Sequence, residues 1–143
     1  KDEGLTFVSR GDDSGTHKAE LKLWKALDVD VATLGDAYVS AGAGMGDTLV
    51  MADEMDAYCL TDRGTWLAKK ANFPEMEVVV EGSAGLLNQY GVIAVNPEVY
   101  PDTNIEGANA YIEWICSEEV QALIADFGVA EYGEPLFFPN ANK

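Results

Sequence analysis

A polar, glycine-containing loop at residues 9–16, with the sequence SRGDDSGT, holds the residue types best suited to chemistry in this chain. It follows the apolar run 5–8 and precedes a segment with helical spacing of apolar residues. Helix N-termini present unpaired backbone N–H donors and the positive end of the helix dipole. Arg10 adds a planar fork of donors that matches a tetrahedral oxyanion. The pattern therefore predicts a site for a small oxyanion where a strand ends and a helix begins.

The other residues of this loop have distinct expected roles. Ser14, Gly15 and Thr16 would supply hydroxyls and backbone N–H groups at the helix start, and Gly15 lets the backbone approach a ligand because it has no Cβ. Asp12 would hold the Arg10 guanidinium by a salt bridge, which orients the fork but also offsets its charge. The alternative is that Ser14 is an ordinary helix cap and Arg10 a surface residue.

Two further turns repeat the theme less specifically. Gly44 and Gly46 precede a predicted helix and would present N–H groups to the same pocket, although glycine turns are common at helix starts. Asp62, Arg63 and Thr65 form a third polar turn before another helix, with a structural salt bridge as the favoured role of Arg63. We treat Gly44 and Gly46 as supporting residues of the predicted site.

Catalytic and metal chemistry are disfavoured by the same sequence. His17 lies on the same helix as Ser14, and neighbours on a helix cannot set up the geometry of a base and its nucleophile. Cys59 and Cys116 lack CxxC spacing, and with one histidine they are too few for a zinc site. We interpret both cysteines as small, buried apolar residues. A disulfide between them stays an alternative. We therefore expect no catalytic residues, no metal and no cofactor.

The charge balance excludes one class of partner. The 143 residues include 9 basic and 25 acidic side chains, a net charge of -16, which argues against nucleic acid. It does not argue against a small anion. Exposed charges more than about 8–10 Å away are largely screened by salt, whereas donors that touch the anion act at full strength. No apolar run is long enough to span a membrane, and the N-terminus shows no signal-peptide core. We therefore expect either that the chain is cytoplasmic or that its targeting segment was removed or left out.

Strands are predicted to alternate with helices along the chain, which indicates an α/β fold. The carboxyl ends of the strands in such a sheet collect ligands, and all three polar turns fall there. A break or cap is considered at residues 117–119, and residues 133–139 form an extended tail. The predicted strands are 5–8, 38–40, 77–80 and 92–95, and the predicted helices are 16–27, 47–59, 65–71 and 107–127.

Five segments in this order resemble the tungstate-binding proteins of ABC transporters. The resemblance covers nearly the whole chain, and the loop RxDxSGT within it is also similar to the anion loop of periplasmic phosphate-binding proteins. That second likeness supports oxyanion chemistry but leaves open which oxyanion is bound. The segments are 7–17 (FVSRGDDSGTH), 44–46 (GMG), 58–65 (YCLTDRGT), 88–97 (NQYGVIAVNP) and 132–137 (YGEPLF).

The resemblance implies a periplasmic-binding-protein-like fold of type II, in which two α/β lobes close over the ligand. In this reading residues 5–88 are the anion-binding α/β lobe, and residues 89–143 are a crossover and return segment that belongs to the other lobe, which is incomplete or absent here. Carried over residue by residue, Ser9 and Arg10 would contact the anion, with Ser14 and Thr16 as further partners.

The same resemblance implies tungstate as the ligand, an ABC transporter permease as partner, and a periplasmic or extracellular location with a lipid anchor in the full-length protein. Alternatives are a molybdate or phosphate receptor, or a sensory ligand-binding domain of the same fold. Without the first lobe, apolar residues such as Trp114, Ile115 and Phe137 lack a partner. We expect that the helix 107–127 packs on its own sheet, that it exchanges elements with another copy of the chain, or that the chain was cut from a longer protein whose N-terminal lobe is the missing partner.

Overall fold

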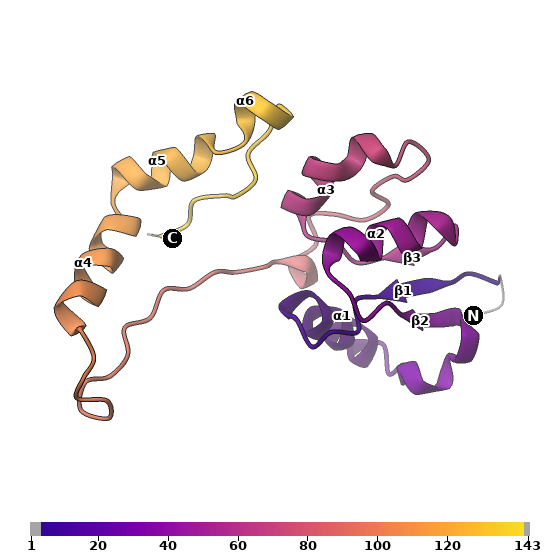
Figure 1. Ribbon diagram of the computed structural model, residues 1–143, viewed down its shortest axis with the longest axis horizontal. Coiled ribbons are helices and arrows are strands. Elements are labelled where there is room, and N and C mark those ends of the chain that lie inside the picture. The colour runs from indigo at the N-terminus through magenta and orange to yellow at the C-terminus, as the bar shows by residue number, and fades with distance from the viewer. Residues whose placement is uncertain (1–3, 142–143) are drawn as a thin grey trace. The chain divides into compact units, whose positions relative to one another are not determined.

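The computed structural model describes residues 4–141. The chain forms two compact units, with the boundary in the sequence between Leu87 and Asn88 (Figure 1). The first unit contains a parallel sheet and its helices, whereas the second is helical. No helix within residues 4–141 has the length and apolar character that crossing a membrane requires.

The sheet of the first unit has three short strands and places the anion loop at its centre. Strand β1 (Phe7–Ser9) lies between β2 (Tyr38–Ser40) and β3 (Tyr58–Cys59), and both neighbours run parallel to it. In this register Val8 pairs with Val39 on one side and with Cys59 on the other. Val8 is fully buried. The loop at residues 9–16 therefore leaves from the central strand.

A helix follows each of the three strands, as expected for an α/β fold. Helix α1 spans Gly15–Ala26, α2 spans Met45–Glu54 and α3 spans Arg63–Lys69. Ser14 and Asp62 cap α1 and α3 by accepting backbone N–H groups of their first turns. Short 3-10 helices complete the unit at Val31–Thr33, Gly35–Ala37, Lys70–Asn72 and Ala84–Leu86.

Helix α2 begins and ends earlier than the predicted range 47–59. Asp56 adopts a left-handed conformation with φ of 48°, and the Ala57 N–H donates to the Ala52 carbonyl at 2.9 Å. This turn ends the helix and releases the chain into β3, where Cys59 pairs with the central strand instead of lining a helix. The core of the unit forms beneath α2, where Met45, Leu49 and Phe73 are buried against Cys59, Trp66 and Met76.

The two segments predicted as the last strands, 77–80 and 92–95, form no strand. Their apolar side chains face solvent, with Val79 63% and Ile93 87% exposed. Both segments are rich in β-branched residues, but a strand needs a hydrogen-bonded neighbour as well as propensity. Within the described residues, the sheet ends at β2 and β3 and does not reach these segments.

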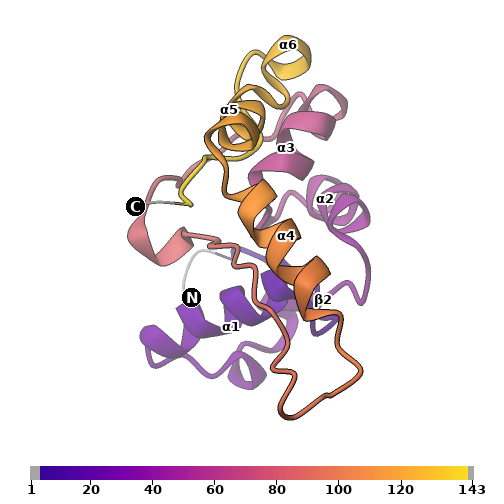
Figure 2. The ribbon, with the colours of Figure 1, turned by 90° about the vertical axis from the view of Figure 1, so that its left-hand side faces the viewer.

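The second unit contains the helices α4 (Ile105–Ile115), α5 (Glu118–Asp126) and α6 (Val129–Tyr132). The predicted helix 107–127 is thus broken where Ser117 caps α5, and α4 and α5 run in different directions (Figure 2). The tail folds back within this unit. Gln121 Oε1 accepts the N–H groups of Asn140 and Ala141, and Phe137 packs on Tyr90 and Phe127.

Candidate functional site

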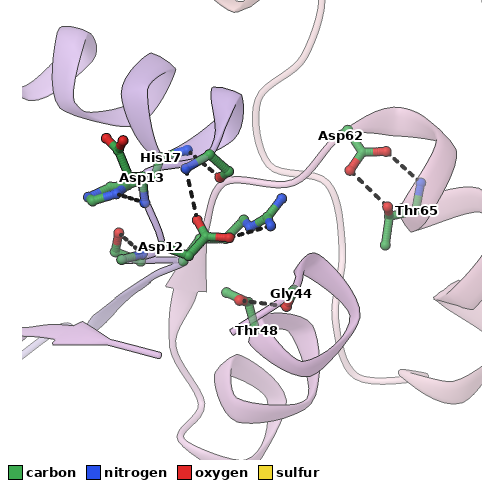
Figure 3. Close-up of polar contacts among 11 residues, drawn as sticks. Asp12, Asp13, His17, Gly44, Thr48, Asp62 and Thr65 are labelled. Atoms are coloured by element: carbon green, nitrogen blue, oxygen red, sulfur yellow. Dashed lines mark hydrogen bonds and ion pairs between the residues drawn. The ribbon is translucent and has the colours of Figure 1, made fainter. Parts of the chain in front are cut away.

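Three polar turns lie at the same edge of the sheet, where the parallel strands end and their helices begin. Helix starts carry unpaired N–H groups and a partial positive charge, so this edge attracts anions. Figure 3 shows polar contacts at the three helix starts, at Asp12, Asp13 and His17 for α1, Gly44 and Thr48 for α2, and Asp62 and Thr65 for α3.

Arg10 is held in place at the first of these turns. Its Nη2 forms an ion pair with Asp12 Oδ2, as the sequence predicted, and only about a fifth of each side chain is exposed. The second oxygen of Asp12, Oδ1, accepts the Ser14 backbone N–H at 3.2 Å. The pKa of Asp12 is lowered from 3.8, mainly by hydrogen bonding to Ser14 and further by Arg10, while desolvation opposes the shift. Asp12 is therefore an ionised carboxylate that orients Arg10.

A buried donor of Arg10 is left for a ligand. Its Nε–H is buried and has no hydrogen-bond acceptor among residues 4–141. Buried donors in native proteins nearly always have an acceptor, because an unpaired one costs about 1–3 kcal/mol. An oxyanion that binds beside this guanidinium would supply the acceptor. This is the feature of the site that points most directly to an anion.

Ser9 lies beneath the loop and not on its surface. The residue is 1% exposed, and its Oγ donates to Glu20 Oε2 while accepting the Gly11 N–H at 3.2 Å. A serine hydroxyl has one proton, and here that proton is used within the protein. A direct contact of the Ser9 hydroxyl with an anion thus stays a prediction from the resemblance, one that requires this proton to turn away from Glu20.

Gly11 fixes the path of the loop between Ser9 and Asp12. Its φ is +60°, and a Cβ at this position would lie 1.7 Å from Ser40 Oγ and 2.9 Å from Ser40 Cβ. Two backbone bonds join the loop to the chain after β2, from Ala41 N–H to the Ser9 carbonyl (2.8 Å) and from Ala43 N–H to the Arg10 carbonyl (3.3 Å). Sequence reasoning did not assign Gly11 a role, although a glycine directly after the arginine was visible.

Ser14, Gly15 and Thr16 form the start of α1, as predicted. Ser14 Oγ accepts the His17 N–H at 3.3 Å, and the first backbone bond of the helix runs from Lys18 N–H to the Ser14 carbonyl. The N–H groups of Gly15 and Thr16 precede that bond. A Cβ added to Gly15 would meet no atom within 4 Å, so the space in front of its backbone is open.

The second turn differs from the first in what its glycines contact. The Gly44 carbonyl accepts both the backbone N–H and the hydroxyl of Thr48 at 3.0 Å, and space beside the Gly44 Cα is open. Gly46 lies against α3, since a Cβ there would be 2.8 Å from Lys69 Cε. This atom lies at the far end of a flexible side chain that can move aside, so the contact with Lys69 does not by itself require a glycine at position 46. A supporting role of both glycines in anion binding stays a prediction.

The polar side chains of the third turn are paired with other residues of the protein. Asp62 accepts the Thr65 N–H and hydroxyl, each at 2.8 Å, and so acts as the cap of α3. Arg63 forms an ion pair with Glu81 at 3.1 Å, the structural role that the sequence favoured. Of the two arginines in the chain, Arg10 is thus the one at the sheet-centred loop.

Glu20 is a polar residue of this region that sequence reasoning missed. It is 3% exposed, and its carboxylate accepts hydrogen bonds from Ser9 Oγ, Trp24 Nε1 (2.9 Å) and Tyr38 Oη (2.7 Å). Burial, opposed in part by Ser9 and reinforced by Glu20, raises the pKa of Tyr38 to about 12. The available signal was its position four residues before Trp24, which places an acidic residue on the inner face of α1.

Ser14 and His17 do not form a nucleophile and base. The contact between them is the backbone N–H of His17 to Ser14 Oγ, while His17 Nδ1 accepts the Asp13 N–H at 3.0 Å. The part of the chain that the structure describes holds no group of three or more His, Cys, Asp or Glu side chains placed to bind a metal ion. Burial raises the pKa of the half-buried Cys59 thiol to about 11.

Residues 1–119 match the model of the PBP superfamily domain, and the chain belongs to this family. The periplasmic-binding-protein-like α/β fold expected from the sequence is thereby confirmed. The match extends over both the three-stranded sheet and the first helix of the second unit.

Individual relatives are tungstate-binding proteins, which confirms the resemblance drawn from the motifs. The chain is 54% identical over 142 residues to the tungstate-binding protein TupA of Peptoclostridium acidaminophilum, covering 99% of this chain and 49% of the relative. The structure of this chain is similar to that of the tungstate-binding protein TupA from Desulfovibrio alaskensis G20. The TM-score is 0.82 and the identity 39%, and the match covers 96% of this chain and 56% of the other.

A tungstate ABC transporter structure from Geobacter sulfurreducens is also similar, with a TM-score of 0.70 and 44% identity over 87% of this chain and 51% of the other. The chain thus spans about half the length of the curated relatives it matches.

Proposed function

We propose that this chain is the anion-binding half of a solute receptor that captures tungstate and delivers it to the permease of an ABC transporter. Relatives described as tungstate-binding proteins match this chain over almost its whole length. The Arg10 turn lies at the end of the central strand, where parallel α/β sheets collect ligands. A periplasmic or extracellular location, with a lipid anchor in the full-length protein, forms part of this proposal.

The observation that carries the proposal is the buried Nε–H of Arg10. Asp12 fixes one side of the guanidinium and leaves this second donor without an acceptor among the described residues. The start of α1 adds backbone N–H groups and the positive end of a 12-residue helix. These donors together suit an oxyanion of tetrahedral shape.

The contacts of Asp12 do not choose between the tetrahedral oxyanions. Its two oxygens accept one donor each, from Arg10 and Ser14, and an ionised carboxylate has further acceptor sites. The choice of tungstate, with molybdate and phosphate as alternatives, therefore rests on the relatives described as tungstate-binding proteins.

A second lobe is the partner that this proposal requires. Relatives are about twice as long as this chain, and residues 89–143 are proposed to return to that lobe. Apolar side chains on both sides of the proposed boundary face solvent, among them Val80 (67%), Ile93 (87%) and Trp114 (55%). An N-terminal lobe, or the equivalent elements of another copy of the chain, would cover them and supply the remaining anion donors.

No chemical step is assigned to the site in this proposal. Binding is read by closure of the two lobes, because contacts from both halves favour the closed state. A sensory domain of the same fold is the alternative. It predicts a DNA-binding or signalling segment in the same gene, whereas a transport receptor predicts a lipoprotein signal and a neighbouring permease gene.

Calorimetric titration of the natural full-length protein with tungstate, molybdate, sulfate and phosphate tests the proposal. We expect tungstate to bind most tightly and Arg10→Ala to weaken it by about 10- to 100-fold, the value of a charge-assisted hydrogen bond. Lys18→Ala is the matched control. It also removes one positive charge, but from a residue of α1 whose ion pair with Asp13 is exposed. The proposal fails if none of the four anions binds, or if Arg10→Ala binds tungstate as the parent protein does.

A further inference from the structure

We propose that Glu20 is the positioning residue of the anion loop, and that it orients Arg10 through Ser9 and Gly11. The proposal rests on the proposed function only for the identity of the ligand. Its structural part concerns a buried carboxylate to which the anion-binding reading assigns no task.

Glu20 joins three elements at one point behind the loop. Its carboxylate accepts Ser9 Oγ from the end of β1, Trp24 Nε1 from α1 and Tyr38 Oη from β2. No lysine, arginine or histidine within residues 4–141 forms an ion pair with it. The charge is therefore held by three neutral donors, while the residue is 97% removed from solvent.

A carboxylate at this position determines the direction of the next hydrogen bond. An ionised carboxylate only accepts hydrogen bonds, so Ser9 must point its single proton at Glu20. The lone pairs of Ser9 Oγ are then turned toward the loop, where one of them accepts the Gly11 N–H at 3.2 Å. Glu20 thus fixes the direction of the Ser9 hydroxyl, which donates to Glu20 and accepts from the Gly11 N–H.

The Gly11 hydrogen bond acts on Arg10 because Arg10 lies between the two bonded residues. Ser9 Oγ and the Gly11 N–H close a small turn around the Arg10 backbone, which is also held by the Ala43 N–H. The φ of +60° at Gly11 and its contact with Ser40 leave this turn little freedom. The direction of the Ser9 hydroxyl therefore contributes to where the guanidinium lies.

Stability alone does not explain this arrangement. Burying a charge is expensive, and apolar side chains of similar volume usually stabilise a core at least as well. A glutamine would satisfy the Tyr38 and Trp24 donors with its oxygen, but its amide would then donate to Ser9. Only the carboxylate offers Ser9 a second oxygen that accepts its proton.

The test is Glu20→Gln in the natural full-length protein, with two readouts. We expect hydrogen exchange of the Gly11 amide in the ligand-free protein to become about tenfold faster, because the Ser9 proton, no longer held by a carboxylate, then competes for the direction of the Gly11 N–H. We expect the affinity for sodium tungstate, measured by calorimetry, to fall about tenfold. The pair Ser9→Ala and Ser9→Ala/Glu20→Gln should show equal affinity, because the effect of Glu20 passes through the Ser9 hydroxyl.

Trp24→Phe is the matched control, since it removes the Nε1 donor to Glu20 Oε1 and keeps an aromatic ring, while Ser9 Oγ stays paired with Glu20 Oε2. It should lower the unfolding midpoint without altering Gly11 exchange or tungstate affinity. The proposal is overturned if Glu20→Gln keeps both parent values, or if Trp24→Phe weakens tungstate binding equally. If the parent protein binds no tungstate, the proposed function fails, and Gly11 exchange still decides the role of Glu20. If Glu20→Gln does not fold, Ser9→Ala must release the Gly11 amide, and an unchanged exchange rate refutes the proposal.

Discussion

Replacing Gly11 by alanine perturbs the anion loop at the position with least room. A non-glycine residue at φ of +60° costs about 1–2 kcal/mol. The new methyl group would also lie 1.7 Å from Ser40 Oγ and 2.9 Å from Ser40 Cβ. Rotation of the Ser40 hydroxyl relieves the first contact, but the second is fixed by strand β2, and such overpacking costs about 1–3 kcal/mol. We therefore expect a total loss of about 2–5 kcal/mol in the free energy of unfolding.

Urea unfolding followed by tryptophan fluorescence measures this loss, because Trp24 and Trp66 lie in the first unit. Gly15→Ala is the matched control four residues along the loop. Its surroundings are open and it occupies the first turn of α1, so alanine there should be neutral or stabilising by about 0.4–1 kcal/mol. Adding Ser40→Gly to Gly11→Ala removes the clash and leaves the backbone strain. The reasoning is refuted if Gly11→Ala unfolds at the urea concentration of Gly15→Ala.

Two further predictions concern Cys59 and Asp62. The pKa of Cys59 is about 11, against an ordinary 9.0, so at pH 8 the folded protein holds about 100-fold less Cys59 thiolate than the unfolded protein. An aromatic disulfide reagent should therefore label Cys59 about 100-fold more slowly in the folded protein. Equal labelling rates would contradict the burial of this thiol. Because burial disfavours the thiolate, the associated stability is present below pH 9.0 and lost as the pH rises toward 11. Asp62→Ala removes the cap of α3 and should cost about 0.5–2 kcal/mol in urea unfolding, whereas Asp53→Ala, an exposed site within α2, should not.

Local signals predicted strand β2, the start of α1 and the ion pair of the anion loop. Strand 38–40 was placed correctly because its apolar and aromatic residues lie between turn residues, and Ser14 marked the start of α1 as a capping residue should. The Arg10–Asp12 ion pair followed from spacing alone. These features depend on residues close in sequence, which is why a single chain reveals them.

Features that depend on distant residues escaped prediction. The end of α2 is set by a left-handed Asp56, a conformation that glycine signals more clearly than aspartate, and by pairing of β3 with β1. Segments 77–80 and 92–95 have strand propensity, but the sequence does not say which strand would pair with them. Glu20 was missed because its three donors come from three elements, and helical spacing shows the face of a residue but not its partners.

The solvent-facing β-branched segments also bear on how this polypeptide avoids self-association. Short apolar runs with strand propensity and free backbone groups are templates for cross-β aggregation. Glu77 and Glu81 flank the run at 78–80, and Pro97 follows closely after 92–95, so each run is bounded by a residue that opposes strand stacking. The net charge of -16 adds repulsion between chains. The acidic composition, which contributes little to anion recognition, thus lowers the tendency of these exposed segments to associate with one another.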